Sequence, residues 1–510
     1  MKKVIVPLSV FFLIIATVAV LVIASCSGGG GSQPAAVATP AAFTVLNPTV
    51  TGPIAAPDRP AAGATTSPAT RNFNFFSSQF DLASRGYVEE EYFISGTASR
   101  FTIPTGTAAT TTATVLDSGN PYKTRIVVRK PINAAAFSGT VIVEWFNVTN
   151  NMDMEPCWYE TYDWLMSKGH VWVGVSAQMV GVNALVSWSK PTNATPTNSP
   201  TATNRYSTLD VSHLANGTLL TSDALHFDIF SQAMQAIKHP GPVNPLSGLT
   251  PKTIIAMGQS QSAVMLSSYV NNVHPLAQVA DAFALESTYG TNIRTDLISP
   301  VWKVLTECDV VLFTEANYRR PDDSKFVTWE TPNTSHNDYR AYVSRVFLEH
   351  RDMNGIAVED SLTCTYMPIG SQVPFYYALT AGLTQLVGWA HGGAPIVSAP
   401  PLDVVQFTPN VVVDRDAFGM TKGGIRFSQV AVPILNNSAD NNGPGTCSRW
   451  GYYIAYPTNT LNDSYATHAS YVSLVTAAAN SALNSNYILP ENATADIAAA
   501  TAALIPPNGK

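Results

Sequence analysis

The sequence predicts an α/β protein built around a mostly parallel sheet of eight strands. From about residue 86 onward, short apolar runs alternate with segments of helical periodicity, which is the pattern of strand–helix units. The fifth of these runs ends in a small-x-Ser-x-small turn that leads directly into a helical segment. The 510 residues are also enough to bury a large core. Together these observations favour a large α/β core with further chain packed on it.

The strand candidates follow one another along the chain. The first two, 86–101 and 122–130, are separated by a turn region rich in Thr and Gly. The others are 139–145, 170–177, the run from Lys252 into the turn, 281–286, 301–307 and 326–330. Helical segments are predicted at 158–168, 223–238, 339–348 and 374–390, and an irregular insertion rich in Ser, Thr, Asn and Pro at 178–215.

The most informative segment is Gly258-Gln259-Ser260-Gln261-Ser262. It follows an apolar strand and precedes a helical run, which is the sequence form of a nucleophile elbow. Gly258 and Ser262 are small, so a strand and a helix can cross closely on either side of Ser260. The helix would direct its N-terminal N–H groups at the serine, which suits a developing oxyanion. The alternative is an ordinary strand–turn–helix connection in which the serine is incidental.

A serine nucleophile needs a histidine to take its proton and a carboxylate to orient that histidine. In this type of fold the chain order is serine, acid, histidine. His336 satisfies this order because it lies in the polar loop after the last strand candidate. The alternative for His336 is a solvated loop histidine. The other histidines precede Ser260, share its helical unit or lie on later helical segments: His170, His213, His226, His239, His274, His350, His391 and His468.

The acid is expected just after the strand that ends at Thr306. Asp309 has the usual placement there, and we predict it as the acid. Glu307 is the alternative, and Glu286, at the end of the preceding strand, is a more distant third. One member of the Glu307 and Asp309 pair is then left to cap the following turn.

An oxyanion hole needs two backbone N–H donors. The N–H of Gln261, directly after the serine, is expected to be the first. The second is expected in the loop after Trp145, where Asn147 and Val148 are the candidates.

The N-terminus has the features of an export signal. Met1-Lys2-Lys3 is followed by an almost wholly apolar stretch from Val4 to Ile23, and Cys26 precedes a glycine run. This pattern predicts a lipoprotein signal peptide over 1–26, with Cys26 as the lipidated residue and the protein held at the bacterial cell envelope, facing the periplasm or the exterior. The alternative is an uncleaved membrane anchor. A flexible linker is predicted over 27–60, the α/β core over 61–340, and an extension that packs on or caps the core over 341–510.

Composition excludes several classes of partner. The formal net charge is −7 and no basic run is present, so nucleic acid is not expected as a partner. No metal-binding motif is visible, and neither a metal nor a cofactor is expected. An exported protein can form disulfides, and we predict the pair Cys364–Cys447 because both lie in the C-terminal part. The remaining pair, Cys157 and Cys308, are expected to be buried free thiols.

Several segments resemble blocks of one protein family. They are Val141–Val148, Val173–Gln178, Phe227–Gln232, Gly258–Ala263 and Glu307–Val310. They are similar to the bacterial α/β-hydrolase domain-containing proteins whose elbow reads G-x-S-Q-S-A, and the resemblance runs from about residue 50 to the C-terminus. The loop around His336 reads Asn-Thr-Ser-His-Asn-Asp where the family pattern is Gly-Thr-Ala-His-Ala-Asp.

The resemblance implies an α/β-hydrolase fold and ester hydrolysis but no particular substrate. With the candidate residues above, it predicts an exported serine hydrolase that acts on a small carboxylic ester through an acyl-enzyme intermediate. Two alternatives remain, because a fold does not fix a function. One is a surface binding lipoprotein that keeps the fold without the chemistry, and the other is an exported serine peptidase.

Overall fold

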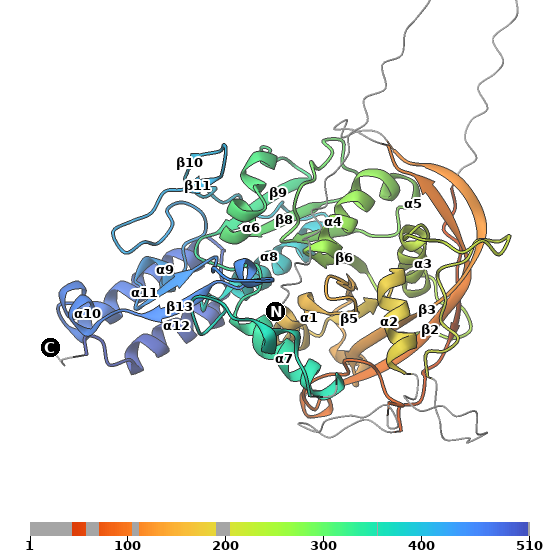
Figure 1. Cartoon of the computed structure of the whole chain (residues 1–510), viewed down its shortest axis with the longest axis horizontal. Helices are drawn as coiled ribbons and strands as arrows, with labels where there is room; N and C mark the ends of the chain where they lie inside the picture. The colour runs from red at the N-terminus through yellow and green to blue at the C-terminus, as the bar shows by residue number, and fades with distance from the viewer. Residues whose placement is uncertain (1–42, 58–70, 105–111, 190–204, 354, 508–510) are drawn as a thin grey trace, which may run out of the picture. The chain divides into compact units, whose positions relative to one another are not determined.

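The computed structural model describes residues 43–57, 71–104, 112–189, 205–353 and 355–507 (Figure 1). The chain divides into two units, Met1–Ala42 and Phe43–Lys510, and the description that follows concerns the second. The predicted signal peptide with Cys26, and most of the predicted linker, lie outside the described residues. No helix among the described residues is long and apolar enough to cross a membrane.

A mostly parallel sheet of nine strands forms the centre of the described unit (Figure 1). Its spatial order is β1-β2-β3-β5-β4-β6-β7-β8-β9. The strands are β1 (Thr49–Thr51), β2 (Tyr87–Thr102), β3 (Thr114–Pro131), β4 (Thr140–Trp145), β5 (Val171–Val175), β6 (Thr253–Gln259), β7 (Ala282–Glu286), β8 (Val301–Thr306) and β9 (Phe326–Thr331). The first four strands of this order pair antiparallel, and β5 to β9 pair parallel. The α/β-hydrolase fold predicted from the sequence is confirmed.

The sheet has one strand more than predicted. The extra strand, β1, pairs antiparallel with the outer edge of β2 and lies inside the range predicted as a flexible linker. At three residues it is too short to show an alternating pattern, and Pro48 and Pro53 flank it. Thr49–Thr51 form a strand because they pair with β2, which is distant in sequence. The linker prediction for 27–60 is therefore wrong at Thr49–Thr51.

Continuous apolar runs explain the central strands. Every residue of β4, β5, β6, β7 and β8 is buried, as expected for parallel strands covered by helices on both faces. The packing includes the fully buried Trp145, Trp172 and Trp302. The central strands therefore form a rigid platform whose C-terminal ends carry the polar residues of interest.

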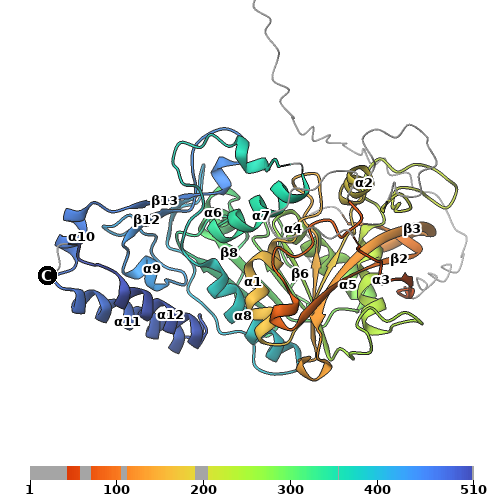
Figure 2. The ribbon, with the colours of Figure 1, turned by 90° about the horizontal axis from the view of Figure 1, so that it is seen from below.

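Helices cover both faces of the sheet. The chain passes from β4 through α1 (Pro156–Ser167) to β5, and returns past β4 through α3 (His226–Lys238) to β6. Because crossovers between parallel strands are right-handed, α1 lies on one face, and α3 and the next helix, α4 (Gln261–Ser268), lie on the other. Figure 1 shows α1 and α4 on opposite sides of β6. The helix α8 (Phe375–Ala390) packs against α1 and against β6, β7 and β8, and Figure 2 shows α8 beside α1.

The range predicted as an irregular insertion, 178–215, contains a helix. Residues Met179–Trp188 form α2, which buries Val182, Leu185 and Trp188. Tertiary packing of these side chains overrides the weak helix propensity of a stretch with three valines and a glycine. The prediction was therefore wrong for Met179–Trp188, and residues 190–204 lie outside the described part.

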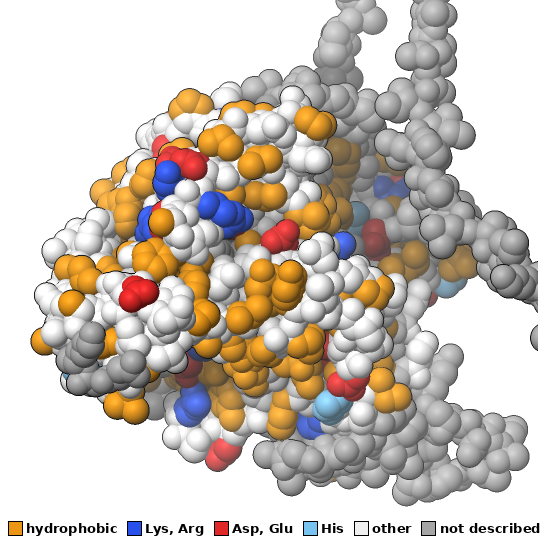
Figure 3. Space-filling model, turned by 60° about the vertical axis from the view of Figure 1, so that its left-hand side comes forward, with side chains coloured by type: hydrophobic (Ala, Val, Ile, Leu, Met, Phe, Trp, Pro, Cys, Tyr) orange, Lys and Arg blue, Asp and Glu red, His pale blue; other side chains and the backbone are white. Residues whose placement is uncertain are grey.

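The C-terminal third supplies one core helix and a set of smaller elements. Besides α8, its helices are α7 (Tyr339–Asp352), α9 (Ser428–Ala431), α10 (Thr458–Ser464), α11 (His468–Asn484) and α12 (Pro490–Ala502). Its two hairpins pair β10 (Val404–Gln406) with β11 (Val412–Val413), and β12 (Leu435–Ser438) with β13 (Tyr452–Ala455). The remaining short helices of the unit are α5 (His274–Ala277) and α6 (Glu307–Leu312). Figure 3 shows how sparse charged side chains are on the face it draws, in keeping with a charged fraction of 12%.

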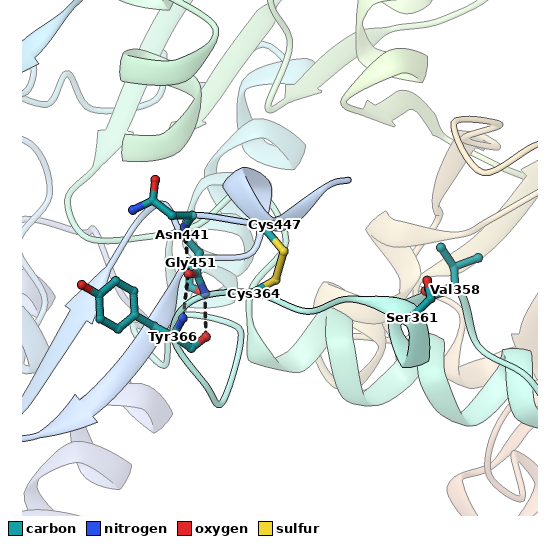
Figure 4. The surroundings of a disulfide bond; sticks show 8 residues. Val358, Ser361, Cys364, Tyr366, Asn441, Cys447 and Gly451 are labelled. Atoms are coloured by element: carbon teal, nitrogen blue, oxygen red, sulfur yellow. Dashed lines mark hydrogen bonds between the residues drawn. A yellow bond between two sulfur atoms is a disulfide. The ribbon is translucent and has the colours of Figure 1, made fainter. Parts of the chain in front are cut away.

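One disulfide fixes part of this C-terminal third. Cys364 and Cys447 are joined across 83 residues of sequence, as predicted (Figure 4). Beside the bond, the amide of Asn441 donates to the carbonyls of Tyr366 (2.8 Å) and Gly451 (3.1 Å). The other predicted thiols, Cys157 and Cys308, are free and buried, also as predicted.

Candidate active site

Ser260 lies on a strained turn between β6 and α4. Its backbone has φ 57° and ψ −123°, a conformation that non-glycine residues rarely adopt. Gly258 is required beside it, because a Cβ there would lie 2.9 Å from the carbonyl oxygen of Ser262. The Ser262 hydroxyl accepts from the N–H of Gln259 (3.0 Å) and donates to its carbonyl (2.9 Å). Serine at 262 therefore closes the turn with its own side chain.

Ser260, His336 and Asp309 form a continuous hydrogen-bonded path. His336 Nε2 lies 2.7 Å from Ser260 Oγ, and His336 Nδ1 lies 2.6 Å from Asp309 Oδ1. The side chains are almost completely buried, with residue exposures of 5% for Ser260, 6% for His336 and 0% for Asp309. Because the carboxylate can only accept, Nδ1 carries the proton and Nε2 is left to accept from the serine.

Asp309 is held by its own helix. Its second carboxylate oxygen accepts the backbone N–H of Thr306 at 2.8 Å, and the Thr306 hydroxyl accepts the N–H of Asp309 at 3.2 Å. This reciprocal capping box starts α6 directly after β8. One carboxylate oxygen is thus fixed by the backbone, which directs the other at His336.

Glu307 does not contact the imidazole. Its carboxylate accepts the backbone N–H of Asn333 at 2.6 Å and the guanidinium of Arg415 at 2.5 Å. Asn333 has a left-handed φ of 56° in the loop that carries His336. Glu307 therefore supports the shape of the loop that carries His336. It is not the carboxylate that orients the imidazole, a position that Asp309 occupies.

Glu286 lies at the end of β7, the strand between β6, which leads to Ser260, and β8, which leads to Asp309. Its backbone carbonyl accepts the N–H of Ser260 at 3.0 Å. Burial, and then the charge of Glu144, raise the pKa of Glu286 well above its ordinary value. Burial also raises the pKa of the neighbouring Cys157 thiol, which keeps it protonated and unreactive. The third acid candidate therefore belongs to a buried group beneath the elbow and has no bond to His336.

The loop with His336 is fixed from several directions. Gln259 Nε2 donates to the carbonyl of His336 at 3.3 Å. Asn333 donates to the carbonyl of Asn437 at 2.9 Å and accepts the N–H of Thr421 at 2.9 Å. The Phe313 ring lies edge-on to the imidazole, with centroids 5.0 Å apart. The loop is therefore held both by residues of the core and by residues of the C-terminal third.

The candidate oxyanion donors differ in whether their backbone N–H is already hydrogen-bonded. Gln261 is the first residue of α4, where a backbone N–H has no partner inside the helix. The N–H of Asn147 is already donated to the carbonyl of Met154 at 3.0 Å, so Asn147 is not a free backbone donor and that prediction was wrong. The N–H of Val148 makes a long contact of 3.4 Å with Gln261 Oε1. Gln261 and Val148 remain the pair of candidate donors.

A pocket opens in front of Ser260. It is lined by Asn147, Thr149, Asn150, Met154, Pro156, Tyr159, Gln259, Ser260, His336, Asn337, Ala341, Arg345, Thr446 and Arg449. Among the described residues, neither the amide nitrogen of Asn150 nor the hydroxyl of Tyr159 has a hydrogen-bond partner, although both atoms are buried. Sequence reasoning missed these polar residues and both arginines. Only Asn150 carried a signal, since it follows the loop expected to supply an oxyanion donor.

No metal site accompanies this arrangement within the described ranges, where no group of three or more His, Cys, Asp or Glu side chains is placed to hold an ion. The polar residues at the strand ends suit proton transfer between a hydroxyl, an imidazole and a carboxylate. Their order along the chain and their positions after β6, β8 and β9 follow the plan of one fold class.

A serine on a strand-to-helix turn at the centre of a mostly parallel, helix-covered sheet defines an α/β hydrolase. The chain belongs to the family described as alpha/beta hydrolase domain, whose sequence model matches residues 50–498. No curated protein matches the sequence.

Solved structures of similar fold include a rice cell wall degrading esterase from Xanthomonas oryzae, with 10% identity, a TM-score of 0.20 and coverage of 40% of this chain and 43% of that one. A serine hydrolase without a lid from Xanthomonas campestris has 12% identity and a TM-score of 0.28, over 51% of this chain and 94% of that one. A dienelactone hydrolase, so named provisionally, from Klebsiella pneumoniae has 14% identity and a TM-score of 0.25, over 51% and 98%. This chain thus spans less than half the length of the Xanthomonas oryzae esterase.

Proposed function

We propose that this protein is a serine hydrolase that cleaves carboxylic esters through an acyl-enzyme intermediate. The observation that carries the proposal is the path from Ser260 Oγ through His336 to Asp309, with distances of 2.7 and 2.6 Å. A buried path of this kind activates a serine hydroxyl, because the imidazole can take its proton and the carboxylate stabilises the resulting charge. The strained backbone at Ser260 adds support, since such strain is concentrated at functional positions.

In the proposed reaction, His336 Nε2 accepts the proton of Ser260 Oγ as that oxygen attacks the ester carbonyl. Asp309 stabilises the imidazolium through Nδ1–H, and the N–H groups of Gln261 and Val148 stabilise the oxyanion. When the tetrahedral intermediate collapses, His336 returns the proton to the leaving alcohol and the acyl group stays on Ser260. A water molecule then attacks the acyl group while His336 Nε2 takes its proton. When the second tetrahedral intermediate collapses, His336 returns this proton to Ser260 Oγ, and the carboxylic acid and the free serine are released. Every step uses side chains, backbone and water, so no cofactor is required.

The proposed setting is the bacterial cell envelope. The apolar stretch and Cys26 suggest export and attachment through a lipid, so the membrane is the proposed partner of the N-terminus. The proposed substrate is a small ester that reaches the hydrolase from the periplasm or the exterior. The disulfide Cys364–Cys447 supports export, because such bonds persist in oxidising compartments.

The test combines active-site labelling with turnover. A fluorophosphonate probe should label the wild-type protein and not Ser260→Ala, since the probe needs an activated serine. With 4-nitrophenyl esters of graded acyl length, Ser260→Ala should lose several orders of magnitude in kcat while melting like the parent. Labelling of neither protein would support the binding lipoprotein instead. Peptide amides cleaved as readily as esters would support the peptidase.

A further inference from the structure

The pocket in front of Ser260 has a charge opposite to that of the chain. The sequence holds 28 basic and 35 acidic residues, yet the pocket lining includes Arg345 and Arg449 and no Asp or Glu. An unbalanced positive charge in a partly desolvated pocket attracts an anion more strongly than it would in water. The ion-pair partners of each arginine show which of the two carries the unbalanced charge.

Arg345 is neutralised inside the protein. Its guanidinium lies 2.5 Å from a carboxylate oxygen of Glu359 and 3.5 Å from one of Glu349, and it stacks over the Trp450 ring at 5.2 Å. All three partners belong to the same C-terminal third. Arg345 therefore contributes shape to the pocket and little net charge.

Arg449 is different. Within the part of the chain that the structure describes, no carboxylate and no other acceptor lies within bonding distance of its guanidinium, which lies 5.8 Å from the centre of the Phe313 ring. The side chain is half-buried. A guanidinium carries five N–H donors in a fixed plane, and those of Arg449 are available to a ligand that enters the pocket. A bound anion would satisfy them.

The backbone fixes Arg449 close to the reacting atoms. Its carbonyl accepts the N–H of Asn337 at 2.9 Å, directly after His336. It ends the short helix Cys447–Arg449, whose first residue is bonded to Cys364. Phe313 contacts both sides, since its ring lies 5.0 Å from the imidazole and 5.8 Å from the guanidinium. The guanidinium and the imidazole therefore lie against the same aromatic ring and line the same pocket.

We propose that Arg449 binds a carboxylate carried by the substrate, so that the preferred esters are half-esters of dicarboxylic acids. The planar guanidinium matches a carboxylate in a bidentate arrangement. The unpartnered amide of Asn150 and hydroxyl of Tyr159 add neutral donors in the same pocket. The inference rests on the proposed ester hydrolysis and names its substrate class.

The experiment compares two esters that differ in one group. Monoethyl glutarate carries a carboxylate where ethyl pentanoate carries a methyl group. We expect wild-type protein to prefer the half-ester in kcat/KM, as followed by pH-stat. In Arg449→Gln, the ratio of the two kcat/KM values should fall by ~10- to 100-fold, the range for hydrogen bonds to charged groups. Lys168→Gln removes the same charge from an exposed site that pairs with Glu491, and should leave the ratio unchanged.

A binding measurement separates this inference from the proposed reaction. Calorimetry on Ser260→Ala should detect monoethyl glutarate, and Ser260→Ala with Arg449→Gln should bind it at least ~10-fold more weakly. Binding by Ser260→Ala that does not change on loss of Arg449, or an unchanged kcat/KM ratio in an active Arg449→Gln, overturns the carboxylate site and leaves ester hydrolysis standing. Absence of turnover of every ester, with Arg449-dependent binding intact, overturns the reaction and supports the site. Melting curves of each variant show that it is folded.

Discussion

Glu307 and Asn333 are joined by a hydrogen bond of 2.6 Å from the backbone N–H to the carboxylate, across 26 residues of sequence. This bond places the neighbouring carboxylate pair in two different roles. Asp309 faces His336, whereas Glu307 braces the loop in which His336 lies. Two acids separated by one residue therefore affect the same imidazole. Asp309 bonds to it directly, and Glu307 holds the loop that carries it.

The first prediction follows from this division. Asp309→Asn should lower kcat by up to ~10⁴, because an amide leaves the imidazolium without an anionic partner and allows the wrong tautomer. Glu307→Gln should cost far less, since an amide oxygen can still accept the N–H of Asn333. Turnover of a 4-nitrophenyl ester by each variant, after a check that both melt like the parent, measures the difference. A larger loss in Glu307→Gln would reverse the roles.

The second prediction concerns the crossing of β6 and α4. Gly258→Ala places a Cβ 2.9 Å from a backbone oxygen of Ser262, which forces strand and helix apart. We expect a loss of about 1–3 kcal/mol in unfolding free energy, the usual cost of overpacking, with a lower kcat. The matched control is Gly388→Ala in α8, where a Cβ meets no atom within 4 Å and a helical alanine is favoured by about 0.5–1 kcal/mol. Denaturant unfolding of both variants is the measurement, and equal stabilities would contradict the steric argument.

The third prediction concerns pH. Burial, followed by the charges of Lys238 and Arg294, lowers the pKa of His274 from 6.5 to about 4. Between pH 6.5 and 4 the unfolded chain therefore binds a proton that the folded chain does not, and this histidine makes the unfolding free energy fall as the pH falls. The change is up to about 3 kcal/mol. His274→Gln removes it.

The unfolding free energies of parent and His274→Gln should accordingly converge as the pH is lowered from 7.5 to 4.5. The variant loses the bond between His274 Nε2 and Ser299 at both pH values. Only the difference between the two proteins in the slope of unfolding free energy against pH therefore reports the titration of His274. Parallel stability curves would show that the pKa of His274 is the same in the folded and unfolded chains, and would contradict the prediction.

The fourth prediction concerns Cys26, which lies outside the described residues. In its native host the mature protein should carry lipid on this cysteine and partition into the detergent phase. Cys26→Ser should release the protein or leave its signal unprocessed. Phase partition and the mass of the N-terminal peptide are the measurements. A cleaved N-terminus with unchanged membrane association would count against the lipidation site.

Local patterns were sufficient to predict the fold and the residues that the structure brings together around Ser260. The elbow is a continuous segment, and His336 and Asp309 each follow directly after a recognisable strand. The disulfide Cys364–Cys447 followed from the position of the two cysteines. The elbow, His336 and Asp309 each depend on a short stretch of chain whose place in the sheet can be counted.

Features that depend on long-range contact could not be read in the same way. The N–H of Asn147 donates to the carbonyl of Met154 because the intervening loop folds back on itself. No local sequence motif predicts this bond. Arg449 reaches the pocket through a disulfide and a bond to Asn337, far along the chain from Ser260. Among the residues that the structure describes, its guanidinium has no carboxylate partner, a property that only the folded chain can show.

The anchoring of the His336 loop by Thr421, Asn437 and Arg449 also sets an order of events during synthesis. A nascent chain that emerges N-terminus first contains its serine, acid and histidine well before these anchors exist. Until they are in place, the imidazole lacks the contacts that hold it against the serine. Under the proposed function, a chain truncated before these anchors would therefore carry the elbow without a positioned histidine.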